Sequence, residues 1–319
     1  MKALVTGASG FIGGHLTERL IEKGYRVKVL VRRTSNLQWL KGLDIETVYG
    51  DIREPESLIP AVEGVDYIFH IAGETKAKSP EVYGKVNYEG TKNIFNISSQ
   101  ENPKLKKFVF FSSQAAAGPS PSLKPLKEED PPNPVSAYGR SKLKAEKFLL
   151  ENSHTLPWII LRPPLIYGPR DPETLLFFQI LKTRIRPGII RYLSVCYVKD
   201  LVEATILAAE SDKRSSIYFI SDGDIYTLDE ISLSLGRIMG RKTFRVPLPT
   251  KILYLYALLL ENIVNKPTVL NRERVVELSQ RYWICDSSKI RRELGFKPRY
   301  PLEEGVKETL NWYIENRWL

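Results

Sequence analysis

Short apolar runs alternate with amphipathic segments along the first half of the chain. The runs are rich in Val, Ile, Leu and Phe, whereas the segments between them repeat apolar residues every three to four positions. The predicted strands are 2–6, 26–31, 45–49, 66–70, 108–112 and 158–162, and the predicted helices are 11–23, 54–62, 81–101 and 135–150. This alternation predicts a doubly wound α/β fold, in which helices cover both faces of a parallel sheet.

The regular alternation ends after Pro163. Two short segments, 197–198 and 217–220, could return to the sheet, and the remaining sequence is mostly helical in pattern. A stretch rich in Pro, Ser and Lys, 118–134, is predicted to be a surface loop. The predicted domains are a sheet domain and a smaller, mostly helical C-terminal substrate cap, with boundaries at 1–165 plus 195–221 and at 166–194 plus 222–319.

Composition narrows the class of protein. The 319 residues are 43% hydrophobic and 26% charged, which is ordinary for a globular chain. No apolar run approaches the roughly 20 residues that span a bilayer, and the chain runs directly into a predicted strand, so neither a transmembrane segment nor a signal peptide is expected. Cys196 and Cys285 follow no metal or redox spacing, which indicates a reduced, cytoplasmic location and no metal.

The net charge of +10 raises the question of a nucleic-acid partner. However, basic residues are mixed with acids, as in Lys144-Ala145-Glu146-Lys147, and there is no basic tail, zinc finger or aromatic RNA-binding signature. A solvated surface with some phosphate-binding residues explains the charge better, so no nucleic acid is expected as a partner.

A glycine motif, Gly7-Ala8-Ser9-Gly10-Phe11-Ile12-Gly13, lies between the first predicted strand and helix. Gly7 permits a tight turn, Gly10 permits close approach of a pyrophosphate, and Gly13 permits close packing of the helix on the strand. The helix N-terminus adds amide donors and the positive end of a dipole. The motif therefore predicts a Rossmann-type dinucleotide site.

The end of the second strand bears on the choice of dinucleotide. Arg32 and Arg33 follow this strand, where an acid would otherwise bind the free ribose hydroxyls. Two guanidinium groups suit a 2′-phosphate, so NADP(H) is preferred, and NAD(H) stays open as an alternative. Asp51, at the end of the third strand, either meets the adenine amino group or caps the following helix.

Tyr138 and Lys142 are four residues apart in a predicted helix and therefore share one face. An ammonium beside a phenol favours the phenolate, so Tyr138 could donate a proton to a ketone oxygen or accept one from an alcohol. Ser113, twenty-five residues upstream of Tyr138, could hydrogen-bond the same oxygen. Their position after the glycine motif favours catalysis over an ordinary surface helix.

These motifs make the chain similar to the extended short-chain dehydrogenase/reductase family, also described as the NAD-dependent epimerase/dehydratase superfamily. The pattern most resembles the dihydroflavonol reductase and 3β-hydroxysteroid dehydrogenase-like branch. The matching segments are Thr6-Gly7-x-x-Gly10-x-x-Gly13, Gly50-Asp51, His70-Ile71-Ala72-Gly73, Val86-Asn87-x-x-Gly90-Thr91, Ser112-Ser113, Tyr138-x-x-x-Lys142, Arg162-Pro163-x-x-x-Tyr167-Gly168-Pro169 and Tyr197-Val198-x-Asp200.

The resemblance implies roles for residues beyond the motifs themselves. Lys142 would also contact the nicotinamide ribose, residues 163–166 would pass along the nicotinamide, and Asn87 would support the site. A homodimer formed through the helices 81–101 and 135–150 is also implied. The implied cofactor-binding residues are Gly7, Ser9, Gly10, Phe11, Ile12, Gly13, Arg32, Arg33, Asp51, Ile52, Ile71, Ala72, Asn87, Lys142, Pro163 and Ile166.

Departures from the family pattern bear on the substrate. Dehydratases carry an Asp-Glu pair directly after the catalytic hydroxyl, whereas Gln114 and alanines follow Ser113 here. Ala117 stands where many epimerases have an aromatic residue, and Leu193 stands where many nucleotide-sugar enzymes have an arginine. These differences argue against nucleotide sugars, although Arg191, two residues before Leu193, could still reach a diphosphate. Other arginines that could hold a diphosphate are Arg272, Arg274 and Arg281.

Residues 251–261 are apolar on nearly every side. A buried cap helix is the simplest interpretation. A lining for a lipid-like substrate, or a patch that rests on a membrane surface, stays open as an alternative, so peripheral membrane contact is retained as a hypothesis.

The leading hypothesis is an NADP(H)-dependent oxidoreductase that interconverts a ketone and a secondary alcohol. Tyr138 would be the acid and base, Lys142 would tune it, and Ser113 would orient the oxygen. The first alternative is a nucleotide-sugar epimerase with tightly held NAD(P). A non-catalytic dinucleotide-sensing protein ranks last, because this chain retains the full catalytic set.

Overall fold

The computed structural model describes residues 1–77, 79–247, 249, 252, 254–258 and 272–319, and these form two compact units. Unit 1 comprises 1–116, 137–162 and 202–218, and unit 2 comprises 117–136, 163–201 and 219–319. These units are defined by packing. The functional division into a dinucleotide-binding domain and a substrate cap near residue 165 stays a prediction.

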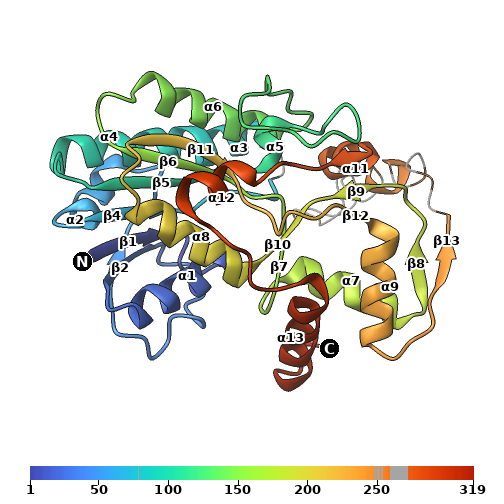
Figure 1. Cartoon of the computed structure of the whole chain (residues 1–319). Coiled ribbons are helices and arrows are strands. Elements are labelled where there is room, and N and C mark those ends of the chain that lie inside the picture. Colours follow the sequence, from blue (N-terminus) through green and yellow to red (C-terminus); the bar gives the residue numbers. More distant parts are fainter. Residues whose placement is uncertain (78, 248, 250–251, 253, 259–271) are drawn as a thin grey trace. The chain divides into compact units, whose positions relative to one another are not determined.

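Unit 1 is built on a seven-stranded sheet, which confirms the predicted doubly wound α/β class (Figure 1). The strand order is β11-β6-β5-β4-β1-β2-β3, and the neighbouring strands from β3 to β6 are parallel. Because the order reverses between β1 and β4, a crevice is expected where the carboxyl ends of these two strands diverge. The strands are β1 (Lys2–Thr6), β2 (Arg26–Val31), β3 (Ile45–Tyr49), β4 (Tyr67–His70), β5 (Lys107–Phe111), β6 (Trp158–Arg162) and β11 (Ser215–Phe219).

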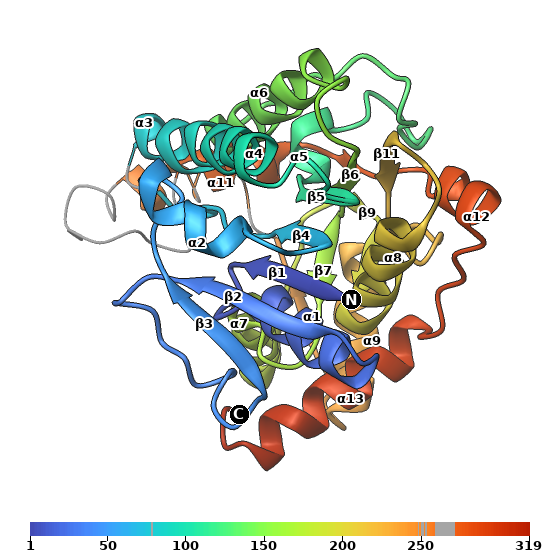
Figure 2. The same cartoon turned by 90° about the vertical axis from the view of Figure 1, so that its left-hand side faces the viewer.

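Helices cover the two faces of this sheet (Figure 2). Helix α1 (Phe11–Glu22) lies on one face, and α2 (Ile59–Val62), α4 (Gly90–Glu101) and α6 (Ala137–Glu151) lie on the other. Fully buried side chains from the strands and from α4 and α6 fill the space between them. The members of this core include Leu4, Ile68, Phe108, Ile160, Ile94, Phe95 and Leu149.

Two predicted helices are interrupted. The segment predicted as one helix over 81–101 consists of α3 (Pro80–Tyr83), a π-helical segment (Gly84–Glu89) and α4. The segment predicted over 54–62 is a 3-10 turn (Pro55–Leu58) followed by α2. Pro60 lacks the backbone donor that a continuous helix would use at this position, which explains the second interruption.

Unit 2 combines helices with small sheets. Its pairs are β7 with β10, β9 with β12 and β14, and β13 with β8. The elements are β7 (Leu165–Tyr167), α7 (Pro172–Lys182), β8 (Ile185–Pro187), β9 (Tyr192–Leu193), β10 (Val195–Tyr197), β12 (Tyr226–Thr227), α9 (Leu228–Ile238), β13 (Phe244–Val246), α11 (Arg272–Ser279), β14 (Tyr282–Trp283), α12 (Ser288–Leu294) and α13 (Leu302–Glu315). Among the described residues, no helix is both long and apolar enough to span a membrane.

Two expectations for the later segments have opposite outcomes. Residues 217–219 belong to β11 and do return to the seven-stranded sheet. Residues 197–198 do not, because Tyr197 ends β10, which pairs with β7, and Val198 begins α8 (Val198–Glu210). A buried contact between the Tyr197 and Tyr167 rings, whose centroids are 5.3 Å apart, accounts for the apolar character that suggested a sheet strand.

The segment predicted as a surface loop, 118–134, is only partly one. Leu126 is buried against Phe219 and Cys285. Its backbone N–H donates to the Ile284 carbonyl at 3.1 Å, and its carbonyl accepts from the Asp286 N–H at 2.8 Å. The segment is therefore anchored beside the chain that follows β14, which a rule based on Pro and Ser content cannot reveal.

Candidate active site

The glycine motif forms a tight crossing at the carboxyl end of β1. Gly7 has φ of +74°, and a Cβ there would lie 2.7 Å from the Ala72 nitrogen. A Cβ on Gly13 would lie 2.2 Å from the Gly7 carbonyl oxygen. Gly10 precedes α1 and provides no side-chain cap for its first amides. The residues present therefore fit a pyrophosphate held by backbone donors at a helix N-terminus.

A buried chain of hydrogen bonds braces this crossing from behind. The His70 Nδ1 lies 2.8 Å from the Thr6 hydroxyl, and Nε2 lies 3.0 Å from the Thr91 hydroxyl. Thr91 donates to the Asn87 carbonyl, and Thr6 accepts from the Ala72 N–H, which assigns the proton of the imidazole to Nε2. Burial, together with the Lys142 charge, lowers the pKa of His70 to about 3. His70 is thus a neutral structural connector between β4 and its neighbours.

The two arginines after β2 are exposed, and no acid accompanies them there. The Arg33 guanidinium lies 5.3 Å from the centre of the Tyr49 ring. The Asp51 carboxylate is held by Arg53, with Oδ2 2.6 Å from Nη2, and this pairing lowers the Asp51 pKa. The 3-10 turn that follows receives no side-chain cap, so Asp51 does not have the alternative role of a helix cap.

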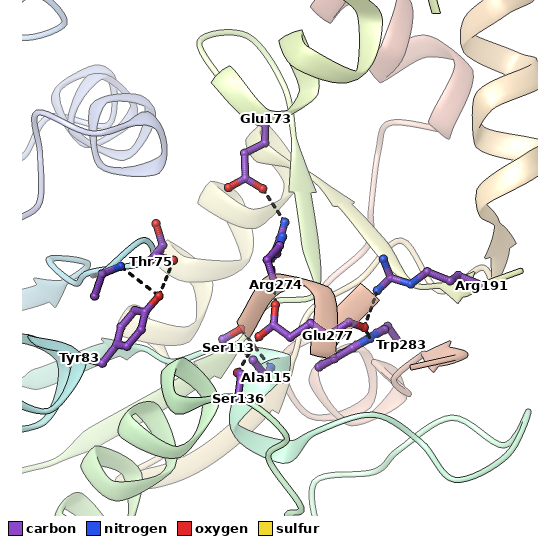
Figure 3. Close-up of polar contacts among 11 residues, drawn as sticks. Thr75, Tyr83, Ser113, Ala115, Ser136, Glu173, Arg191, Arg274, Glu277 and Trp283 are labelled. Carbon is purple, nitrogen blue, oxygen red and sulfur yellow. Dashed lines mark hydrogen bonds and ion pairs between the residues drawn. The ribbon is translucent and has the colours of Figure 1, made fainter. Parts of the chain in front are cut away.

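The predicted catalytic residues come from two neighbouring elements of unit 1. Tyr138 and Lys142 lie one turn apart on α6, and Ser113 directly follows the end of β5. Lys142 reaches that end, because its Nζ donates to the Phe111 carbonyl at 2.8 Å. The Ser113 oxygen accepts from the Ala115 N–H at 3.1 Å (Figure 3). The structure thus brings the ammonium to the strand end that carries Ser113.

Asn87 joins α6 to the turn after β4. Its amide oxygen accepts from the Glu74 N–H at 2.7 Å, and its amide nitrogen donates to the Glu74 carbonyl and to the Ser141 hydroxyl, each at 3.0 Å. A Cβ on Gly73 would lie 3.1 Å from both the Asn87 oxygen and the Lys142 Nζ. Asn87 therefore connects the turn after β4 to the helix that carries Lys142.

Two neighbours of the site were not predicted. Tyr83 is buried, and its ring packs edge-on against Tyr138 with centroids 6.0 Å apart. Its hydroxyl accepts from the Ala77 N–H at 3.1 Å and lies 3.4 Å from the Thr75 carbonyl (Figure 3). The only hint in the sequence is that Tyr83 lies four residues before Asn87, a spacing that places two residues on one face of a helix.

The second unpredicted feature is a buried ion pair beneath the site. Glu146, one turn after Lys142 on α6, pairs with Arg162 at 2.6 Å and also accepts from the Ser112 hydroxyl. All of these side chains are buried. The hint in the sequence is that Glu146 lies on the apolar side of the helix predicted over 135–150.

Two of the predicted cofactor-binding residues, Pro163 and Ile166, lie in unit 2, whereas Ser9, Phe11, Ile12, Ile52 and Ile71 lie in unit 1. Pro163 directly follows β6, and Ile166 lies within β7 opposite Cys196. Their predicted contact with the nicotinamide stays a prediction. Within the described residues, no group of three or more His, Cys, Asp or Glu side chains could hold a metal ion.

The arginines considered as diphosphate ligands are engaged within unit 2. Glu277, on α11, accepts from the Ser136 hydroxyl and pairs with Arg274, which also pairs with Glu173 at 2.6 Å (Figure 3). Arg191 is half-buried, and its Nη2 lies 3.4 Å from the Glu277 carbonyl oxygen. This network fixes Arg274 between two carboxylates.

Arg281 is placed differently, because its guanidinium lies 5.8 Å and 5.4 Å from the centres of the Tyr192 and Tyr282 rings. The side chain of Arg272 is outside the described part of the chain. The described geometry of unit 2 therefore provides packing partners for Arg274 and Arg281 rather than a ready diphosphate clamp.

Burial of Lys142 predicts how activity depends on pH. Burial lowers the Lys142 pKa from 10.5 to about 8, and the Glu146 charge partly opposes this. Since the ammonium is present below that pH, kcat/KM for the ketone reduction that the sequence predicts should fall as the pH rises through about 8. We would measure the profile from about pH 6 to about pH 10.

A matched variant tests whether Lys142 causes this fall of kcat/KM with rising pH, called the pH limb below. Glu146→Gln keeps the shape of the side chain but removes the charge that raises the Lys142 pKa, so the limb should move to lower pH. A profile that stays flat to about pH 10, or a limb that Glu146→Gln leaves in place, would contradict the assignment.

The fold and the site together define a dinucleotide-binding enzyme of the Rossmann type. A family model described as the NAD dependent epimerase/dehydratase family matches residues 3–221. The chain belongs to this family, and the predicted resemblance to extended short-chain dehydrogenases/reductases is confirmed.

Individual relatives are similar over nearly their whole length. A ceramide reductase from Caulobacter vibrioides is 28% identical, with 99% of this chain and 95% of the relative covered. The 4-hydroxy-2-methyl-3-oxo-4-farnesyl-3,4-dihydroquinoline-1-oxide ketoreductase of Stigmatella aurantiaca is 27% identical, with 96% and 95% covered. The solved UDP-glucose 4-epimerase of Thermotoga maritima with UDP-glucose has a TM-score of 0.82 at 26% identity, with 99% and 100% covered.

Proposed function

We propose that this protein is an NADP(H)-dependent reductase that acts on a ketone of a hydrophobic, lipid-like molecule. The observation that carries the proposal is the Lys142 ammonium, which is buried on α6 one turn from Tyr138 and bound to the end of β5 beside Ser113. This arrangement is suited to proton transfer at a carbonyl oxygen.

Each residue has a defined task in the proposed reaction. When bound, the nicotinamide supplies the hydride for the carbonyl carbon. Tyr138 donates its phenolic proton to the carbonyl oxygen, and Lys142 stabilises the resulting phenolate through its positive charge. Ser113 hydrogen-bonds the same oxygen and holds it in place as negative charge develops. In the reverse direction Tyr138 accepts the alcohol proton.

The cofactor would be held by backbone groups of the glycine crossing and by side chains of the adjacent strand ends. Asn87 and Lys142 support the ribose side of the site, and Arg32 and Arg33 would bind a 2′-phosphate. The exposed state of both arginines, and the lack of an acid beside them at the end of β2, favour NADP(H) over NAD(H).

Removal of the arginines should therefore change the cofactor preference. In Arg32→Ala and Arg33→Ala, KM for NADPH should rise about tenfold each, because a charge-assisted hydrogen bond to phosphate is lost. KM for NADH should stay within about twofold. Steady-state kinetics with both cofactors measure this.

The matched control is Arg26→Ala, at the opposite end of the same strand, where the guanidinium is also exposed. It should leave both KM values unchanged. Equal changes for NADPH and NADH in the Arg32 and Arg33 variants would contradict the proposed phosphate contact.

Two observations favour a reductase over an epimerase. Arg274 is held by two carboxylates and Arg281 lies over two rings, so neither is poised as a diphosphate ligand. Two of the similar proteins are a ceramide reductase and a ketoreductase of a farnesylated compound, and both names describe hydrophobic substrates.

The second candidate is a nucleotide-sugar epimerase, which the similarity to the Thermotoga enzyme favours. NADPH consumption across a panel of lipid-like and sugar ketones separates the two. Net consumption supports the reductase. The epimerase would replace it if nothing is consumed, the cofactor stays bound through purification and a UDP-sugar is interconverted with its 4-epimer.

The proposal also includes a homodimer in the cytoplasm, as the family resemblance implies. The two cysteines are free and buried, in keeping with a reducing compartment. Sedimentation of the purified protein tests the dimer.

A further inference from the structure

A small ribbon in unit 2 has one face covered and one face open. Strands β8 and β13 pair in parallel, with Ile185 opposite Phe244 and Arg186 opposite Arg245 (Figure 1). Both arginines face Asp229 of α9, at 3.0 Å and 3.8 Å. Since side chains alternate along a strand, Ile185 and Phe244 point to the opposite face.

That opposite face is apolar and exposed. We define the ribbon face as Ile185, Pro187, Phe244 and Val246. Phe244 is 67% exposed, Ile185 45% and Val246 38%. Single exposed apolar residues are common, but three exposed side chains and the half-buried Pro187 on one small sheet face form a patch that requires an explanation.

The chain on either side of the ribbon adds further exposed apolar residues. Ile190, two residues after Gly188, is 60% exposed, and Ile252 and Leu255 are 61% and 60% exposed. Tyr254 and Tyr256 are exposed as well. Residues 251–261 lie partly outside the described residues. Among the described members Ala257 is buried, but Ile252 and 254–256 are exposed, so the segment is not buried on every side.

Apart from Asp229 on the covered face, the two segments that form the ribbon carry charge of a single sign. Residues 182–192 contain four basic residues and 237–258 contain five, and neither segment contains Asp or Glu. Lys182, Arg184, Arg241 and Lys242 are exposed.

We infer that the ribbon face docks on an anionic lipid bilayer. The apolar side chains would enter the boundary between headgroups and acyl chains, and the surrounding cations would pair with anionic headgroups. Charge complementarity favours this occupant over a second copy of the chain, because the same face of another copy would bring like charges together.

The inference is tested with vesicles and no substrate, so its outcome is independent of the proposed reductase activity. The full chain is sedimented with vesicles of phosphatidylcholine and phosphatidylserine, and with vesicles of phosphatidylcholine alone. We expect co-sedimentation with the anionic vesicles, weakened by salt because salt screens exposed charges.

Two variants test the two parts of the face separately. Ile185→Ser/Phe244→Ser should lower the partition coefficient about tenfold or more, since two apolar side chains no longer leave water. Arg241→Glu/Lys242→Glu should lower it about fivefold or more for each charge lost. Circular dichroism shows whether the Ile185→Ser/Phe244→Ser variant is folded. If it is not, the Arg241→Glu/Lys242→Glu variant still tests whether the ribbon face binds anionic vesicles.

The controls make the same chemical changes elsewhere in unit 2. Ile314→Ser removes an exposed apolar side chain of α13, and Arg292→Glu/Lys297→Glu makes the same change in net charge. Both should bind vesicles as the natural sequence does. The inference is overturned if the natural sequence does not bind anionic vesicles, if the controls lose as much binding as the variants, or if Phe244 is needed only for self-association.

Discussion

Tyr138→Phe should lower kcat/KM for ketone reduction by about 10²- to 10⁴-fold, the range that a positioned acid contributes. The phenyl ring can keep the edge-on contact with Tyr83, so only the hydroxyl is lost. Because the glycine crossing belongs to β1 and α1 whereas Tyr138 belongs to α6, the Kd for NADPH should change by less than about threefold. Stopped-flow reduction rates and fluorescence titration of NADPH provide the two measurements.

The matched control is Tyr88→Phe, in the π-helical segment of the same unit. Tyr88 packs its ring under the Lys144 ammonium at 3.9 Å, a contact that phenylalanine retains. Its kcat/KM should stay within about twofold. If Tyr138→Phe retains near-normal turnover, or if Tyr88→Phe loses as much, Tyr138 is not the acid.

The local parts of this site could be predicted from the sequence. The spacing of Tyr138 and Lys142 places both on one face of a helix whatever surrounds them. Gly7 and Gly13 are required by a crossing that a Cβ would block, and such requirements can be recognised from spacing alone. Six strands of the sheet could be predicted as well, because each is a short apolar run and such a run is a local property of the sequence.

Features that depend on contacts between distant segments could not be predicted. The partners of Glu146 lie at Ser112 and Arg162, on two different strand ends. The role of Leu126 depends on the chain after β14, and the failure of 197–198 to join the sheet depends on β7. A pattern of apolar residues shows that a segment is buried, but it does not show which neighbour buries it.

Glu146→Ala should be among the most destabilising single changes in unit 1. Its carboxylate bonds Arg162 at 3.0 Å and 2.6 Å, and both side chains are almost completely buried. Removal of the carboxylate leaves a guanidinium buried without its counter-ion, which costs about 3–5 kcal/mol of unfolding free energy. Urea unfolding followed by circular dichroism measures this loss.

A double variant separates the cost of an unpaired charge from the cost of lost packing. Glu146→Met/Arg162→Met removes both charges and fills similar volume, so most of the lost stability should return, as for other buried pairs replaced by apolar residues. The matched control, Glu22→Ala, breaks an exposed pair with Arg19 and should cost no more than about 1 kcal/mol.

The two results together define what Glu146 does. If Glu146→Ala costs no more than Glu22→Ala, the buried pair does not hold α6 against β6, and the position of Lys142 must depend on Asn87 instead. If the double variant is stable but reduces ketones slowly, with the pH limb moved below about 8, Glu146 acts on catalysis through the charge that it presents to Lys142. A stable double variant with unchanged pH dependence would limit Glu146 to a structural role.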